Sequence, residues 1–211
     1  MTDKLERWFQ QMPVVAILRG VEPEEAIAIG QAVHRAGIGI IEVPLNSPEP
    51  LQSIKHLSQA LGDQCVIGAG TVLTVADVEA VADAGGEIIV SPNSNPAVIV
   101  RSLELGLVPM PGWATVTEAF LAYENGARYL KLFPASTYGP IHIKGASAVL
   151  PKDCKILAVG GAGANTAGEW LNAGAHGFGI GSELYQAGDS AEQVYQSALA
   201  VVTAMQAARG N

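Results

Sequence analysis

One lysine of this sequence lies inside an apolar segment, where a charged side chain is unusual. Lys131 interrupts the run Tyr129-Leu130-Lys131-Leu132-Phe133, whereas the other lysines fall in segments expected to be helices, loops or strand entrances. Burial of an ammonium group is costly, and it lowers the pKa of a lysine from its ordinary value of about 10.4. A lysine whose pKa falls to roughly 7 to 8 carries a substantial fraction of free amine, which attacks ketones. We therefore interpret Lys131 as a candidate nucleophile.

A carboxylate and a guanidinium occur in two other apolar segments. Glu42 interrupts the run at residues 40–44, and alternation along a strand places Ile41 and Val43 on the face opposite to it. Arg19 closes the run at residues 14–20. A nearby cation would lower the pKa of Lys131 further, and a carboxylate could carry protons for its reaction. The alternative is that Lys131 and Glu42 form only a structural ion pair.

The same alternation predicts a further polar neighbour. Thr71 follows Ile67 and Ala69 at alternate positions, just as Arg19 follows residues 15 and 17. We expect these two side chains to face the interior that also contains Lys131 and Glu42.

These residues must be positioned by a repeated pattern of strands and helices. Short apolar runs alternate with longer amphipathic stretches eight times, without a linker or a change of composition. The expected strands cover residues 14–20, 38–45, 65–72, 88–92, 107–111, 129–134, 156–161 and 177–182. This pattern predicts a single (β/α)8 TIM barrel over residues 1–211, with residues 1–13 as an additional leading helix packed on it. The alternative is an open doubly wound sheet, but no Gly-x-Gly-x-x-Gly motif follows the first strand.

Glycines at the ends of the last two expected strands suggest an anion site. Gly160 and Gly161 end the seventh strand, and Gly181 and Ser182 end the eighth. Glycine-rich loops can bring backbone N–H groups close to a phosphate, and barrels commonly bind phosphate at these two positions. We therefore predict that both loops bind a phosphate group.

Composition excludes several classes of protein. The formal charge of -8 provides no basic face for nucleic acid, and no apolar run approaches the length of a membrane span. The start of the chain carries charges and no unbroken apolar stretch, so we expect neither a signal peptide nor an anchor there. The two cysteines, Cys65 and Cys154, are too few for a disulfide framework, which fits the cytoplasm.

A metal site is not expected. The histidines are scattered singly and show no paired spacing; they are His34, His56, His142 and His176. We therefore expect neither a metal nor another cofactor.

Taken together, the motifs resemble the 2-keto-3-deoxy-6-phosphogluconate and -galactonate aldolase family from Val14 to about Leu184. They are Ile17-Leu18-Arg19-Gly20, Ile41-Glu42-Val43-Pro44-Leu45-Asn46-Ser47-Pro48, Gly68-Ala69-Gly70-Thr71-Val72, Ser91-Pro92-Asn93, Pro111-Gly112 with Thr115, Lys131-Leu132-Phe133-Pro134-Ala135 and Val159-Gly160-Gly161. The resemblance implies a class I aldolase in which Lys131 forms the Schiff base and Glu42 is the acid/base carboxylate. The positions that match substrate-binding residues are Arg19, Thr71, Gly160, Gly161, Gly181 and Ser182.

Two positions resemble the galactonate branch of that family. Asn46 stands in a Pro-Leu-Asn-Ser-Pro segment where the gluconate branch has Thr-Leu-Arg-Thr, and Val159 stands where that branch has threonine. The resemblance thus implies cleavage of 2-dehydro-3-deoxy-6-phospho-D-galactonate to pyruvate and D-glyceraldehyde 3-phosphate. It also implies a homotrimer, which is common in the family.

Other functions remain open at this stage. The same chemistry could serve 2-dehydro-3-deoxy-6-phosphogluconate, 4-hydroxy-2-oxoglutarate or another non-phosphorylated keto acid. The chain could also be a non-catalytic phosphosugar-binding barrel, or an isomerase without a covalent step. Ser91, Asn93 and Trp113 fit either a site or an ordinary loop.

Overall fold

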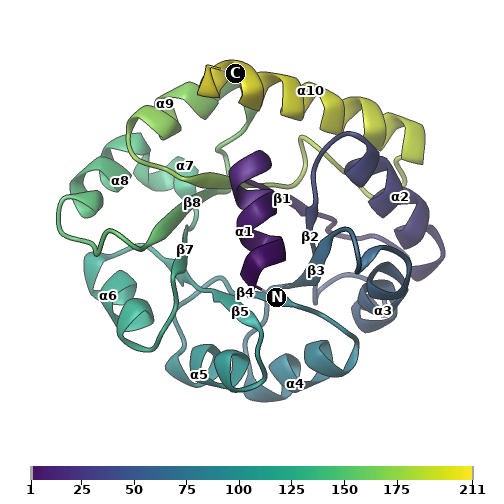
Figure 1. Ribbon diagram of the computed structural model, residues 1–211, viewed down its shortest axis with the longest axis horizontal. Coiled ribbons are helices and arrows are strands. Elements are labelled where there is room, and N and C mark those ends of the chain that lie inside the picture. Colours follow the sequence, from purple (N-terminus) through teal and green to yellow (C-terminus); the bar gives the residue numbers. More distant parts are fainter. Residues whose placement is uncertain (1, 211) are drawn as a thin grey trace.

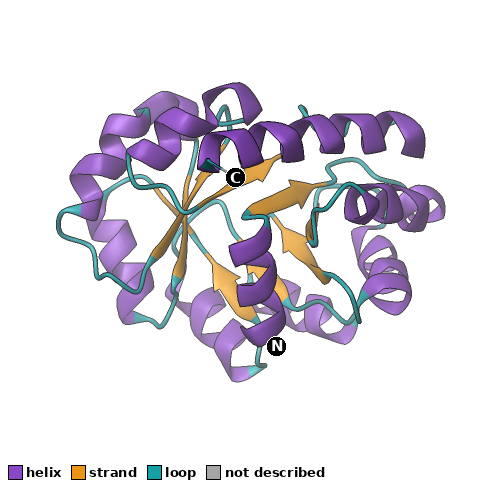
Figure 2. Cartoon of the chain, turned by 45° about the horizontal axis from the view of Figure 1, so that its top comes forward, coloured by secondary structure: helices purple, strands orange, loops and turns teal. Residues whose placement is uncertain are grey.

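The computed structural model describes residues 2–210, so Met1 and Asn211 of the predicted domain lie outside the described residues. All the strands belong to one parallel sheet, in the order β5-β4-β3-β2-β1-β9-β8-β7-β6. The strands are β1 Val14–Ile17, β2 Ile40–Pro44, β3 Val66–Gly70, β4 Ile88–Val90, β5 Val108–Met110, β6 Gly112–Trp113, β7 Tyr129–Leu132, β8 Lys155–Val159 and β9 Gly177–Ile180. Helices surround these strands on the outside (Figures 1 and 2).

The two edges of this sheet meet, so the barrel closes. β5 pairs with β4, β6 pairs with β7, and only Pro111 separates β5 from β6 along the chain. The carbonyl oxygen of Pro111 accepts the Lys131 amide at 2.9 Å, which continues the pairing across the break. Pro111 has no N–H to donate, so regular pairing is interrupted there. The expected fifth strand, residues 107–111, coincides with β5, and the same place in the barrel continues in β6, beyond the predicted end. The predicted (β/α)8 barrel is confirmed.

The helices begin at recognisable residues. Thr74 and Thr115 cap their helices with side-chain oxygens, and Asn95 accepts the amide of Ala97. The helices are α1 Thr2–Gln11, α2 Pro23–Arg35, α3 Pro50–Leu61, α4 Val75–Asp83, α5 Pro96–Glu104, α6 Val116–Glu124, α7 Ala135–Tyr138, α8 Pro140–Ser147, the 3-10 turn η1 Ala164–Thr166, α9 Ala167–Asn172 and α10 Ala191–Arg209. Among residues 2–210, no helix combines the length and the apolar character needed to cross a membrane.

The strands stop earlier at their carboxyl ends than the apolar runs suggest. β1 ends at Ile17 and β9 at Ile180, although the predicted strands reached residues 20 and 182. Arg19 and Ser182 therefore lie in loops just beyond the sheet. This places them at the end of the barrel where loops, rather than paired strands, define the surface.

Apolar side chains form two groups, one inside the barrel and one between the strands and the helices. Val15 and Ile40 belong to the interior group, and alternation from them places Glu42 inside, as predicted. In β3, the face expected for Ile67 and Ala69 is wrong. Ile67 and Ala69 pack in the outer group, whereas Val66 joins the interior group.

The leading helix α1 closes the amino-terminal end of the barrel, where it lies across the middle of the ring in Figure 1. Leu5, Trp8 and Phe9 are buried against the interior group, as predicted. Trp8 fills the space over Gly39, where a Cβ atom would lie 1.9 Å from the indole ring. Its Nε1 donates to the carbonyl oxygen of Gln64 at 2.7 Å. The opposite, carboxyl-terminal end of the barrel is left free for a pocket.

Candidate active site

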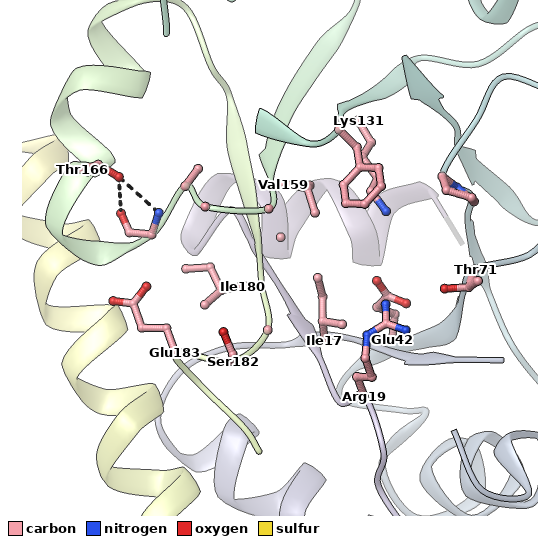
Figure 3. Close-up of a pocket in the computed structure, with 18 of the residues that line it drawn as sticks. Ile17, Arg19, Glu42, Thr71, Lys131, Val159, Thr166, Ile180, Ser182 and Glu183 are labelled. Atoms are coloured by element: carbon pink, nitrogen blue, oxygen red, sulfur yellow. Dashed lines mark hydrogen bonds between the residues drawn. The ribbon is translucent and has the colours of Figure 1, made fainter. Parts of the chain in front are cut away.

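A pocket of about 510 Å³ opens at the carboxyl ends of the strands, which is where barrel enzymes place their active sites. It brings together nine of the residues singled out from the sequence: Arg19, Glu42, Thr71, Lys131, Val159, Gly160, Gly161, Gly181 and Ser182. The charged part of the pocket and its glycine-rich part lie at opposite ends in Figure 3. Lys131, Glu42, Arg19 and Thr71 lie at one end, and Ser182 and Glu183 at the other.

Lys131 lies in β7 with 7% of its surface exposed. Its amine points toward Glu42 in Figure 3 and lies 4.6 Å from the centre of the Phe133 ring. Burial lowers the pKa of Lys131, and the positive charge of Arg19 lowers it further, while the negative charge of Glu42 acts in the opposite direction. The environment therefore favours the neutral amine, which is the nucleophilic form.

Glu42 lies in β2 with 2% of its surface exposed. Burial raises its pKa to about 7, although the charges of Lys131 and Arg19 oppose this rise. Its Oε2 atom is buried and accepts no hydrogen bond from any residue in the range 2–210. Within the same range, Glu42 and Lys131 form no direct ion pair. The two groups therefore face the same pocket while leaving space between them.

Thr71 reaches this pocket by an unexpected route. It follows β3, where alternation from the observed strand would point its side chain outward, yet it lines the pocket. Its φ of 58° lies in the left-handed region, which is rare for a β-branched residue. This turn of the backbone redirects the Thr71 side chain toward Glu42 and Arg19 (Figure 3).

Asn46, a predicted specificity residue, does not line the pocket but contacts a residue that does. Arg19 Nη1 donates to Asn46 Oδ1 at 2.5 Å. The backbone amide of Gly20 donates to Ser47 Oγ at 3.0 Å, so the loops after β1 and β2 are joined twice. Asn46 therefore reaches the site through the orientation of Arg19. Val159 is placed differently, since its side chain forms part of the pocket wall.

The other end of the pocket is built from backbone. Gly160 and Gly161 follow β8 with φ angles of 87° and 83°, a conformation that favours glycine. A Cβ atom at Gly161 would lie 2.5 Å from Ser136 Cβ, so the loop also needs glycine to approach α7. Gly181 and Ser182 line the same end from the loop after β9. Backbone in such loops can bind an anion.

Several pocket residues were not singled out from the sequence. Glu183 lies beside Ser182, and each of its carboxylate oxygens accepts the Ala164 amide at 3.2 Å. The available signal was its position directly after the predicted phosphate loop. The other members are Ala162, Gly163, Asn165, Thr166, Gly179 and Ile180, together with Ile17, Pro92 and Phe133, which the sequence showed as parts of motifs without a role of their own.

The three residues left open by the sequence lie outside the pocket lining. Ser91 is buried, and Asn93 belongs to the loop after β4. Trp113 is 1% exposed and stacks on His142, with ring centroids 5.5 Å apart. In the described part of the chain, histidine, cysteine and acidic side chains do not gather in groups of three or more that could hold a metal ion.

Comparison with known proteins relates this site to one family. The sequence model of the KDPG and KHG aldolase family matches residues 5–201. The 2-dehydro-3-deoxy-6-phosphogalactonate aldolase of Escherichia coli K12 is 48% identical over 198 residues, covering 94% of this chain and 97% of that protein.

Two solved structures resemble the chain closely. A structure described as native KDPGal is 47% identical, with a TM-score of 0.93, and the match covers 95% of this chain and 98% of the other. A cube-shaped protein cage, designed by fusing symmetric oligomeric domains, has the same identity and TM-score over 95% of this chain and 74% of its own. The chain belongs to the KDPG and KHG aldolase family.

Proposed function

We propose that the protein is a class I aldolase that cleaves 2-dehydro-3-deoxy-6-phospho-D-galactonate to pyruvate and D-glyceraldehyde 3-phosphate. The observation that carries this proposal is the placement of Lys131 and Glu42 in one pocket, where burial favours the neutral form of each. A neutral amine and a carboxyl group that titrates near neutrality are the two groups that Schiff-base chemistry requires. The identity to a galactonate aldolase supports the choice of substrate.

The reaction begins with attack of the Lys131 amine on the C2 ketone of the substrate. A bond forms between Nζ and C2, and the ketone oxygen becomes the hydroxyl of a carbinolamine. Glu42, acting through a water molecule, donates a proton to that hydroxyl, which leaves as water. The product is an iminium ion that withdraws electrons from the neighbouring C3–C4 bond.

Cleavage then uses Glu42 as a base. Its carboxylate accepts the proton of the C4 hydroxyl, the C3–C4 bond breaks, and the electron pair moves into the iminium to form an enamine. The aldehyde product leaves. Glu42 returns a proton to C3, and hydrolysis of the iminium releases pyruvate and restores the amine of Lys131.

The two ends of the pocket would hold the two ends of the substrate. Arg19 and Thr71 lie beside Glu42 and are placed to bind the carboxylate of the pyruvate portion. The loops that contain Gly160, Gly161, Gly181 and Ser182 would bind the terminal phosphate. Binding far from the reacting bond fixes the orientation of the substrate.

Epimer preference would depend on Val159 and Asn46. Val159 forms part of the wall between the two ends, and a valine cannot hydrogen-bond the C4 hydroxyl as a threonine can. Asn46 acts through Arg19. The alternative substrate is the gluconate epimer, which uses the same chemistry.

The test is cleavage of both epimeric 6-phosphates side by side, coupled to detection of pyruvate, with Lys131→Ala as the control. We expect faster cleavage of the galactonate epimer and loss of turnover in the control. Preference for the gluconate epimer would keep the mechanism but reject the specificity assignment. Borohydride should also trap pyruvate on the wild type and not on Lys131→Ala. Absence of both lysine-dependent cleavage and trapping would favour a non-catalytic phosphosugar-binding barrel.

We also propose that residues 1–211 act as one domain that assembles as a homotrimer in the cytoplasm. The design of a cage from symmetric oligomeric domains, one chain of which is 47% identical, supports self-association. The two free cysteines, both buried, are compatible with a reducing compartment. Sedimentation equilibrium should give three times the mass of the chain, and a monomeric mass would reject the trimer.

A further inference from the structure

Gly70 is the last residue of β3 and lies beside the carboxylate of Glu42. A Cβ atom at residue 70 would lie 1.4 Å from Glu42 Oε2, 2.4 Å from its Cδ and 2.8 Å from its Oε1, and these are the three nearest atoms. Heavy atoms in ordinary contact are about 3.5 Å apart. The Glu42 carboxylate therefore occupies the volume that any larger residue at position 70 would need.

The backbone does not explain the glycine at this position. The φ of Gly70 lies outside the left-handed region, and Gly70 pairs regularly with Pro44 in the sheet. Gly68, two residues earlier, differs because a Cβ atom there would lie 2.1 Å from the carbonyl oxygen of Ile88. Residue 68 must be glycine for the neighbouring strand to approach. At residue 70 the atoms in the way belong to the end of the Glu42 side chain and not to backbone.

The Glu42 carboxylate packs directly over Gly70. No hydrogen bond reaches Oε2 from the described residues, and Glu42 makes no ion pair with Lys131 there. The space above Gly70 is where the carboxylate lies. Thr71 follows immediately, and its left-handed backbone turns the next side chain into the same pocket.

We propose that Gly70 is a positioning residue of the reaction. Because it has no side chain, it leaves a space that holds the Glu42 carboxylate facing Lys131, and we call this space the seat. The proposal rests on the proposed role of Glu42 in carrying protons. Alanine at residue 70 would push the carboxylate away by about 2 Å, which is the difference between 1.4 Å and ordinary contact. Displacement by about 1 Å can already reduce a rate by about 10²-fold.

The first experiment is a double-mutant cycle in kcat with wild type, Gly70→Ala, Glu42→Asp and the double variant. Aspartate is one methylene shorter than glutamate, so its carboxylate leaves room for the new methyl group. We expect kcat to fall about 10²-fold in Gly70→Ala and to recover by about tenfold when Glu42→Asp is added. In the wild-type background, by contrast, Glu42→Asp should lower kcat. The proposal would be overturned if Glu42→Asp lowered kcat by the same factor with Gly70 and with Gly70→Ala. It would also be overturned if kcat of Gly70→Ala were within about threefold of wild type.

A second cycle measures thermal stability and needs no activity. Gly70→Ala should lower Tm clearly in the presence of Glu42, but little in a Glu42→Ala background, where the seat is empty. If Gly70→Ala alone does not fold, folding of the double variant with Glu42→Ala still gives the expected result. An equal loss of Tm in both backgrounds, or failure of both variants to fold, would show that Gly70 serves the backbone and would reject the seat.

The two cycles also separate this inference from the proposed role of Glu42. Glu42→Gln keeps the size of the side chain and tests proton transfer directly. If Glu42→Gln is fully active while the Tm cycle still shows coupling, Glu42 is not the proton carrier but does occupy the seat. That result would reject a role for Gly70 in the reaction, while the steric contact between Gly70 and Glu42 would stand.

Discussion

Burial in one pocket shifts the pKa values of Lys131 and Glu42 in opposite directions. Burial disfavours charge on both, so it lowers the pKa of the amine and raises the pKa of the carboxyl group to about 7. The mutual attraction of the two charges acts against both changes, and Arg19 lowers the pKa of each. At neutral pH, Glu42 is therefore present in both protonation states, as its proposed role of donating and then accepting a proton requires.

The first prediction concerns the pH dependence of the rate. If Glu42 is the base in carbon–carbon cleavage, kcat/KM, which reports the free enzyme, should rise as the pH increases through about 7, where the carboxyl group loses its proton. Glu42→Gln should lower kcat by about 10² to 10⁴ and remove this rise. The measurement is a pH–rate profile of both proteins. A profile with the same midpoint in Glu42→Gln would assign the titration to another group.

The second prediction concerns the pH dependence of stability. The folded pKa of Glu42, about 7, is higher than its ordinary value of 4.5, so the folded state binds the proton more tightly. Glu42 therefore opposes folding increasingly as the pH rises from about 4.5 to about 7, by on the order of 3 kcal/mol in total. Glutamine carries no such charge. The Tm of Glu42→Gln minus the Tm of wild type should increase between pH 5 and pH 8. A difference in Tm that stays constant over this range would contradict the buried charge.

The third prediction concerns Glu183 at the glycine-rich end of the pocket. Of the residues that line the pocket, Arg19 and Lys131 are the cationic ones, and both lie at the far end (Figure 3). A phosphate at the glycine loops would therefore meet the Glu183 carboxylate without a neighbouring cation. Glu183→Gln should lower KM for the phosphorylated substrate a few-fold and leave kcat unchanged.

The control for Glu183 is a substrate that lacks the phosphate. Its KM should be the same for wild type and Glu183→Gln, since the repulsion is absent. A higher KM for the phosphorylated substrate in Glu183→Gln would mean instead that the contact of Glu183 with the Ala164 amide orders the loop.

At the scale of elements, the leading helix α1 is part of the barrel core rather than an appendage. Trp8 is 8% exposed, fills the space over Gly39 and donates to Gln64. Trp8→Ala would leave a cavity, and large-to-small changes of this kind cost about 3 to 5 kcal/mol. We expect a loss of roughly 10 °C in Tm for a chain of this size. The matched control is Arg7→Ala at the exposed neighbouring position, which should change Tm little.

The elements were largely predictable because their signals are local. Each expected strand coincides with an observed one, since strands buried on both faces read as continuous apolar runs. Thr74, Asn95 and Thr115 begin helices with a side-chain cap, and such starts are visible in a sequence because capping depends on nearby backbone. The short helices α7 and α8 follow β7 without such a side-chain cap, so no local signal marks where each of them begins.

The site was predictable where alternation holds and not where the backbone departs from it. Lys131 and Glu42 lie within regular strands, so parity placed both correctly. Thr71 reaches the pocket only because its φ is 58°, and nothing in the sequence pattern indicates that conformation. Asn46 and Arg19 come together through a loop contact, which periodicity does not describe.

At the scale of the whole molecule, the two ends of the barrel have different tasks. The amino-terminal end is filled by α1, and the carboxyl-terminal end carries the pocket. The last helix returns to the first, because Arg209 donates to the carbonyl oxygens of Gln10 and Gln11 at 2.7 and 2.8 Å. The start of α1 is separated from this contact only by the length of its 10 residues, about 15 Å.

This arrangement predicts that the chain tolerates circular permutation at one end of the barrel but not at the other. A Gly/Ser linker of about ten residues spans roughly 15 to 19 Å and can join the original ends. New ends between Lys152 and Asp153, two exposed residues in the turn before β8, lie on the face opposite the pocket. This permutant should fold and keep kcat and KM within about threefold of wild type. New ends between Gly163 and Ala164 should instead raise KM for the phosphorylated substrate, because they cut the loop at the glycine-rich end. Steady-state kinetics and circular dichroism of both permutants measure this difference. Equal kinetic damage in both would show that the two ends of the barrel are not functionally separate.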